Sequence, residues 1–231
     1  MSLIAEAIKR ISIVAEQNNH RNLPGSIMYE RDTSNPSIPH NIIQRRYYSE
    51  NRCLQPQDLT QEQIKELTKQ YRFKLPQEFY DLYQIGNGCL PIGISPENNW
   101  DSIYNYFYFP NINSSLWNIH NIMNFYKSSL INCNPQLLCI CSYGDESGLF
   151  LVGNETEQET GAVVWTYGAD MNDDITNMEV LWSSLTNMIL TYAEIYEEKY
   201  QRQLTEQKIK AIYKKYGGNA ERKFLRFYFG E

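Results

Sequence analysis

The sequence predicts an α+β fold in which a mostly antiparallel sheet is flanked by helices. Apolar side chains recur every three to four positions near both ends of the chain, at residues 2–16 and 185–196, which is the spacing of an amphipathic helix. Three short apolar runs follow one another between residues 136 and 167, separated by polar loops. Helices and strands that gather in separate blocks, instead of alternating, indicate an α+β domain.

The first 56 residues are expected to form one helix followed by a loop-rich arm. Leu3, Ile8 and Ile11 belong to the apolar stripe of the helix over residues 2–16. Prolines punctuate the residues that follow, which predicts little regular structure from 18 to 56: Pro24, Pro36, Pro39 and Pro56. We therefore assign residues 1–56 to an N-terminal helix and arm.

Two short helices are expected between residues 60 and 88. Thr60 and Gln63 match a capping box, in which the hydroxyl accepts a hydrogen bond from an unpaired helix amide and the glutamine reaches back to the cap. Pro76 suits the first turn of the second helix, where its missing N–H is not needed. Gly86 or Gly88 supplies the left-handed residue that ends this helix. Because the GNG sequence follows a helix instead of preceding one, we do not expect it to bind phosphate.

The rest of the chain is expected to hold a helix, a sheet and two closing helices. The helix covers residues 116–126, with Ser114 or Ser115 as its cap. Four runs rich in apolar and aromatic residues predict strands, and the last three predict an antiparallel meander: 103–109, 136–141, 148–153 and 161–167. The closing helices follow over residues 185–196 and 209–216, and Gly217 and Gly218 end the second one.

Charge is distributed unevenly along the chain. Residues 78–193 carry 13 acidic side chains and one basic side chain, a net charge of −12, and the two ends carry +3 each. Such a field steers cationic partners, and the scarcity of lysine and arginine opposes nucleic-acid binding by this main body. A solvated surface that only keeps the protein soluble is the alternative. The candidate partner-binding carboxylates are Asp101, Asp145, Glu146, Asp170, Asp173 and Asp174.

The C-terminal extension is basic and carries interleaved aromatic residues from 208 to 229. Such a stretch could touch nucleic acid or a membrane surface. Its small net charge and its helical apolar stripe instead favour packing back onto the domain.

No constellation of residues typical of catalysis or metal binding is found. Cys139 and Cys141 are two apart on a predicted strand, so both are expected on one face of it, as buried small hydrophobes. The acidic run at 170–174 lacks the glycine and the final glutamate of a calcium loop. An enzyme that uses Cys89 or Cys139 with His120 is a further alternative, but no nucleophile motif accompanies these residues. We expect no cofactor and no metal.

Two stretches carry a family resemblance, "LPQEFYDLYQIGNG" and "LLCICSYGDESGLFLV". With "MEVLWSSLTNMIL" as the closing helix and its serine start, they resemble the SUKH superfamily, the Smi/Knr-like proteins. The resemblance covers about residues 57–195, which predicts a central SUKH-like domain and leaves 196–231 as a C-terminal helical extension. The signature positions are Leu75, Pro76, Phe79, Leu82, Asn87, Gly88, Gly144 and Asp145.

The resemblance implies a non-catalytic domain that binds proteins. Bacterial members resemble immunity proteins that bind and neutralise toxins, often nucleases, and fungal relatives resemble scaffolds that link cell-wall synthesis to signalling. We therefore expect an immunity-type protein with a basic toxin partner, and a regulatory scaffold is the alternative. Neither role brings catalytic residues or a cofactor.

The N-terminus does not read as a secretion signal. Glu6, Lys9 and Arg10 interrupt its apolar stretch, and no run approaches the length needed to span a bilayer. A cytoplasmic protein without a membrane span is the expectation.

Overall fold

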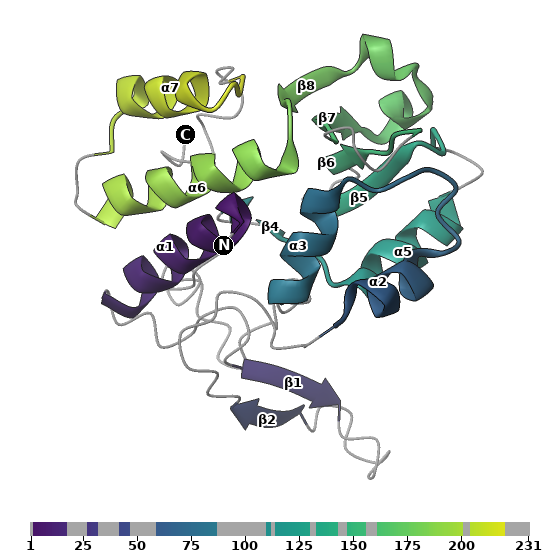
Figure 1. Ribbon diagram of the computed structural model, residues 1–231, viewed down its shortest axis with the longest axis horizontal. Coiled ribbons are helices and arrows are strands. Elements are labelled where there is room, and N and C mark those ends of the chain that lie inside the picture. Colours follow the sequence, from purple (N-terminus) through teal and green to yellow (C-terminus); the bar gives the residue numbers. More distant parts are fainter. Residues whose placement is uncertain are drawn as a thin grey trace.

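A computed structural model describes residues 2–17, 27–31, 42–46, 59–86, 110–111, 114–129, 133–142, 147–155, 161–200 and 204–219. Its centre is a four-stranded antiparallel sheet in the order β5-β6-β7-β8 (Figure 1). The strands are β5 (Leu137–Ser142), β6 (Ser147–Val152), β7 (Val163–Tyr167) and β8 (Glu179–Trp182). The predicted α+β class and the meander are confirmed. The strand predicted at 103–109 lies outside the described residues.

Helices flank this sheet. Within the described residues they are α1 (Leu3–Gln17), α2 (Gln61–Thr68), α3 (Gln77–Ile85), α5 (Ile119–Ser129), α6 (Leu185–Tyr200) and α7 (Glu206–Lys215). α1 packs along α6, and α7 packs on α6 (Figure 1). α3 contacts α1, α2 and α6, and α5 packs against α2 and β5. None of the helices in these ranges is long and apolar enough to cross a membrane.

The N-terminal arm contains a hairpin. β1 (Ile27–Arg31) pairs with β2 (Ile42–Arg46) in antiparallel register. The expectation of little regular structure is therefore wrong for these ten residues, because the prolines of the arm lie outside the strands instead of interrupting them. A second short pair joins β3 (Pro110–Asn111) to β4 (Ser114–Ser115).

Both faces of the main sheet are covered. Leu138 and Leu149 lie in the main core, to which all six of these helices contribute side chains. Phe150 and Val164 face the other way, into a smaller cluster that includes Met171. This alternation along each strand is the side-chain period of a sheet.

A bulge in β5 changes the alternation at the cysteines. Cys139 lies opposite Phe150, whereas Cys141 lies opposite Leu149, so Ile140 is an extra residue in this register. Cys139 therefore joins the smaller cluster and Cys141 the main core. The prediction that both lie on one face is wrong for this reason. The prediction that both are buried is confirmed.

The ends of α2 and α3 are set by local sequence. The N–H of Gln63 donates to Oγ1 of Thr60 at 3.3 Å, and the N–H of Thr60 donates to Oε1 of Gln63 at 2.8 Å, which confirms the capping box. Pro76 is the N-cap of α3. Gly86 ends α3 with φ −178°, an extended conformation that any residue adopts, so it is not the expected left-handed residue. Gly88 lies outside the described residues.

The start of α5 differs from the prediction, whereas the end of α7 agrees with it. α5 begins after Asn118, whose Oδ1 accepts a hydrogen bond from the N–H of Asn121 at 2.8 Å. Ser114 and Ser115, the expected caps, instead form β4. Gly217, with φ 66°, ends α7 as expected.

Strand β8 is not among the predicted strands. The closing helix expected over residues 185–196 is confirmed as α6, and its serine start as well, because Oγ of Ser184 accepts a hydrogen bond from the N–H of Asn187 at 3.0 Å. Leu3 also departs from expectation. It is 59% exposed, because the buried face of α1 consists of Ile4, Ala7, Ile8, Ile11 and Val14.

Candidate interaction surface

The connection between β7 and β8 carries three of the predicted partner-binding carboxylates. It consists of two 3₁₀ helices, η1 (Gly168–Asn172) and η2 (Ile175–Asn177). Asp170, Asp173 and Asp174 are all exposed on it. We call residues 168–178 the acidic segment.

Apolar side chains hold the acidic segment against the sheet. Met171 is buried in the smaller core cluster, and Ile175 and Met178 pack against the same cluster. The N–H of Asn134 donates to the carbonyl oxygen of Met171 at 2.7 Å, and its side-chain Nδ2 donates to the carbonyl oxygen of Asp173 at 3.1 Å. The backbone that carries the aspartates is therefore held in place by the smaller core cluster and by the hydrogen bonds from Asn134. Sequence analysis missed this role of Asn134, because the two segments are far apart in the chain.

The carboxylate of Asp174 is held in its ionised form. Its Oδ1 accepts hydrogen bonds from the N–H of Thr176 at 2.9 Å and from the hydroxyl of Thr176 at 2.8 Å. These bonds, led by the one from the backbone, lower the pKa of Asp174 below its usual value. Asp174 therefore caps η2 and keeps its negative charge at the surface.

Three glutamates on α6, in contrast, form ion pairs with cations of neighbouring helices. Glu194 pairs with Lys215, Glu197 with Arg10, and Glu198 with Lys208, each with an N–O distance of 2.6 Å. The cations come from α1 and α7, so the charge of α6 is neutralised inside the molecule.

The aspartates of the acidic segment differ in this respect within the part of the chain that the structure describes. Asp170, Asp173 and Asp174 form no ion pair with any residue that the structure describes. Within these residues their charge is therefore not neutralised. The other candidates, Asp101, Asp145 and Glu146, lie outside the described residues.

The predicted signature residues on α3 have a structural role. Leu75, Pro76, Phe79 and Leu82 are buried, and Phe79 stacks on Tyr83 with ring centroids 4.5 Å apart. The remaining signature positions fall outside the described ranges: Asn87, Gly88, Gly144 and Asp145.

The start of α3 also orients α6. Oε2 of Glu78 accepts a hydrogen bond from the N–H of Thr186, in the first turn of α6, at 2.7 Å. A carboxylate at this position satisfies an otherwise unpaired amide and interacts favourably with the helix dipole. The signature stretch therefore builds the frame on which the sheet and α6 rest.

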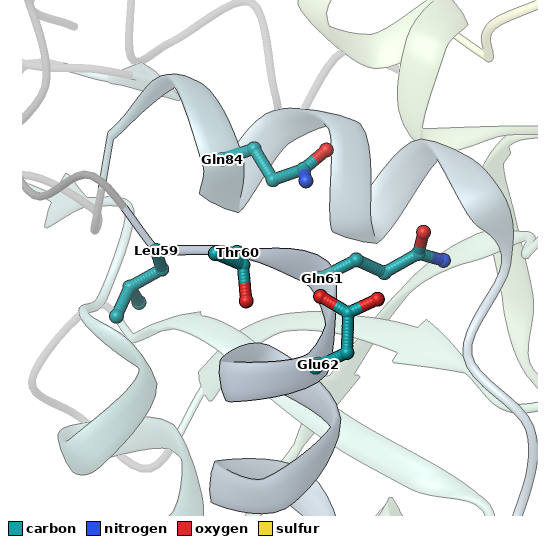
Figure 2. A pocket seen from close by; sticks show the side chains of 5 residues that line it. All are labelled: Leu59, Thr60, Gln61, Glu62 and Gln84. Atoms are coloured by element: carbon teal, nitrogen blue, oxygen red, sulfur yellow. The ribbon is translucent and has the colours of Figure 1, made fainter.

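A pocket of about 450 Å³ lies between the start of α2 and the last turn of α3 (Figure 2). Leu59, Thr60, Gln61 and Glu62 line it from one side, and Gln84 faces them from α3 (Figure 2). Thr60 already serves the capping box. Hydrogen bonds at the N-terminus of α2 lower the pKa of Glu62, its own N–H first and Thr60 second. The hydroxyl of Thr60 and the carboxylate of Glu62 are thus engaged at the start of α2, so the lining gives no reason to propose a reaction here.

The thiol chemistry of the described residues opposes the enzyme alternative. Burial raises the pKa of the Cys139 thiol well above its usual value, which disfavours the reactive thiolate. His120 is exposed on α5, whereas Cys139 is buried in the sheet. Cys89 lies outside the described residues. Within the described part of the chain, no group of acidic, cysteine and histidine side chains is arranged to hold a metal ion.

Comparison with models of known protein families matched residues 58–191 to the SMI1 / KNR4 family (SUKH-1). The match covers more than half of the chain. The chain belongs to the SMI1/KNR4 family. A search of curated proteins found no match.

Membership of the SUKH-1 family makes this a domain of the protein-interaction or immunity type. The matched residues run from the start of α2 into α6 and include the sheet and the acidic segment. α1 and α7, which supply the cations for α6, lie outside the match.

Proposed function

We propose that this SUKH-1 protein is a non-catalytic, immunity-type protein that binds and neutralises a basic toxin domain through the acidic segment. The observation that carries the proposal is the contrast between paired and unpaired carboxylates. α6 is neutralised from within the chain, whereas Asp170, Asp173 and Asp174 are exposed and have no cation among the described residues.

The chemistry of a nuclease fits such a surface. A nuclease grips phosphates with lysine and arginine, so its active-site cleft is positively charged. Carboxylates on a segment whose backbone is already held in place can bind those cations without the entropic cost of ordering a flexible loop. Long-range attraction between the two surfaces also accelerates association.

Neutralisation of the three aspartates tests the proposal. The variant Asp170→Asn, Asp173→Asn, Asp174→Asn keeps side-chain size, and asparagine at position 174 still caps η2. We expect association with a basic toxin domain encoded beside this gene to slow by about tenfold or more at low salt, and we expect the wild-type rate to fall as salt rises. Surface plasmon resonance at several salt concentrations measures both.

A matched control removes the same charge elsewhere. Glu62→Gln, Glu66→Gln, Glu155→Gln also changes the net charge by three, at exposed positions outside the acidic segment. Equal slowing in the two triple variants would show that only net charge matters, and the acidic segment would lose its assigned role.

A regulatory scaffold is the second candidate, favoured by apolar side chains on the outside of α1. Leu3 is 59% and Ile13 41% exposed, on a helix outside the family match. Such residues are typical of a docking surface when they gather in a patch. The toxin assay separates the candidates, because a scaffold would show no binding to the toxin and no salt-dependent protection.

A further inference from the structure

Val180, on β8, extends the smaller core cluster out to the surface. Its side chain is 47% exposed. It pairs across the sheet with Val164, which is fully buried in the smaller cluster, and directly opposite residues of an antiparallel pair point to the same face. The next residue, Leu181, belongs to the main core on the other face. Val180 therefore lies on the face of the sheet that also carries the acidic segment.

Two residues of the acidic segment continue this apolar surface. Ile175 and Met178 are partly exposed, and both pack against the smaller cluster. We call Ile175, Met178 and Val180 the apolar strip. Asp173 and Asp174 directly precede it and are exposed. Apolar residues that gather beside polar ones in this way are typical of an interaction site, whereas single exposed apolar residues are not.

The described contacts at the outer edge of β8 leave Val180 exposed. The N–H of Asn219, after α7, donates to the carbonyl oxygen of Leu181 at 2.8 Å. Nδ2 of Asn219 lies 3.4 Å from Oε1 of Glu179, so this carboxylate has a partner within the chain. In Figure 1 the connection between β7 and β8 lies on the opposite side of the picture from α1. Val180 keeps its exposure beside these contacts.

We propose that the apolar strip and the acidic segment form one docking surface, whose occupant is a protein surface that presents an aliphatic side chain between lysine and arginine residues. Val180 is the residue that the aliphatic side chain covers. This docking surface rests on the proposed function, because it takes the acidic segment as the partner-binding site. An apolar centre with a polar and charged rim is the usual anatomy of an interface.

The charges around the apolar strip favour a basic occupant. The sequence from residue 128 to 198 contains no lysine, arginine or histidine, and Lys127 lies on α5. Lys214 and Lys215 are at the end of α7, where Lys215 is paired with Glu194. The carboxylates of the acidic segment and of β8 are Asp170, Asp173, Asp174 and Glu179. Lysine and arginine also carry methylene stems that can lie along an apolar surface while their charges reach these carboxylates.

The two parts of the docking surface are expected to act on different rate constants. The aspartates attract a basic partner over a distance and so accelerate association, an effect that salt weakens. Covering Val180 removes apolar area from water and so slows dissociation, because contacts within an interface act mostly on that step. A basic partner without an aliphatic side chain at this place is therefore expected to dissociate faster.

Two peptides of equal charge test the docking surface by NMR on the full chain. The probes are Lys-Arg-Leu-Leu-Arg-Lys and Lys-Arg-Ser-Ser-Arg-Lys, both with blocked ends. We expect the leucine peptide to bind at least about fivefold more tightly, because it buries apolar area on the strip. It should shift the methyl signals of Ile175, Met178 and Val180 together with the amide signals of the acidic segment. The serine peptide should shift the amide signals alone. High salt should weaken both peptides and preserve their ratio, since screening acts on the charges.

A variant with a matched control assigns the preference to Val180. Val180→Thr keeps the β-branched shape that suits a strand and replaces a methyl group by a hydroxyl at an exposed position. It should weaken the leucine peptide by about fourfold, the effect of one buried methyl group, and leave the serine peptide unchanged. Unchanged binding of the serine peptide also shows that the acidic segment is intact. Ile13→Ala removes an apolar side chain that is 41% exposed on α1, and it should affect neither peptide.

Equal affinity of the wild type for the two peptides would overturn the apolar part of the docking surface. Equal losses in Val180→Thr and Ile13→Ala would overturn it as well. If the methyl signals of the strip shift with protein concentration in the absence of peptide, a second copy is the occupant and the proposal is wrong. The toxin assay is independent of these outcomes. A wild type that binds no toxin contradicts the proposed function, whereas toxin binding without any preference between the peptides contradicts the docking surface alone.

Discussion

Gly217 is the described glycine at which the backbone is left-handed, with φ 66°. A Cβ at this position would meet nothing closer than Oγ of Ser183 at 3.6 Å, so a side chain fits and only the backbone conformation opposes it. Gly217→Ala is therefore expected to lower the free energy of unfolding by about 1 kcal/mol. Gly217→Asn should lower it by less, because asparagine tolerates this conformation.

Urea unfolding of the two variants measures this difference. If alanine and asparagine both leave stability unchanged, the turn after α7 does not depend on a left-handed residue. That result would also weaken the route by which the chain reaches β8.

The caps of α2 and α5 show which helix starts can be predicted from adjacent residues in the sequence. Thr60 and Gln63 are three positions apart and both bonds of their capping box form, since everything they need lies within one turn. Ser114 and Ser115 are equally good caps by chemistry, yet they pair with β3, and Asn118 takes the cap. The choice between a strand and a cap depends on a partner strand, which is a tertiary contact.

Among the elements, α7 is held to α6 partly through Glu194. Burial alone would raise the pKa of Glu194, but hydrogen bonds from Lys215 and Tyr216 outweigh it and lower the pKa below 4.5. Because the folded pKa is depressed, this contribution to stability is present in full above about pH 4.5 and is lost as the pH falls through the folded pKa.

Glu194→Gln is accordingly expected to lower the free energy of unfolding by about 0.5 kcal/mol at neutral pH, a magnitude typical of a partly exposed pair. The difference from wild type should shrink as the pH falls below about 4.5. Urea titrations at pH 7 and at pH 3.5 measure it, with Glu155→Gln as an exposed control. A difference that stays constant between these pH values would show that the ion pair does not contribute.

The strand β8 and the bulge in β5 are elements that periodicity could not define. β8 has only four residues, and of these only Leu181 and Trp182 are buried, in a strand that contacts β7 and α6. In β5, the chain around Ile140 is long enough for a regular strand, but the register with β6 shifts there. The alternation of apolar and polar residues along one strand cannot reveal a bulge, because a residue is extra only relative to its pairing with the opposite strand.

At the scale of the whole molecule, α1 belongs to the main core although it lies outside the family match. Ile11 is fully buried there, whereas Ile13 on the same helix is 41% exposed. Ile11→Ala is expected to lower the free energy of unfolding by about 2–4 kcal/mol, and Ile13→Ala to change it by less than about 0.5 kcal/mol. Thermal or urea unfolding should show a single transition for both. A separate early transition in the Ile11 variant would show that α1 unfolds independently.

The sequence by itself determined the class of fold, the capping of α2, the meander and the acidic charge of residues 78–193, because spacing and composition are properties of short stretches. The family resemblance rested on particular motifs such as "LPQEFYDLYQIGNG". Only the tertiary structure decided which of the described carboxylates are neutralised by a cation from another helix. Arg10, Lys208 and Lys215 reach α6 from helices that folding brings beside it, and no described cation reaches the acidic segment. Charge pairing depends on distance in space, and distance in space depends on the packing of the whole chain.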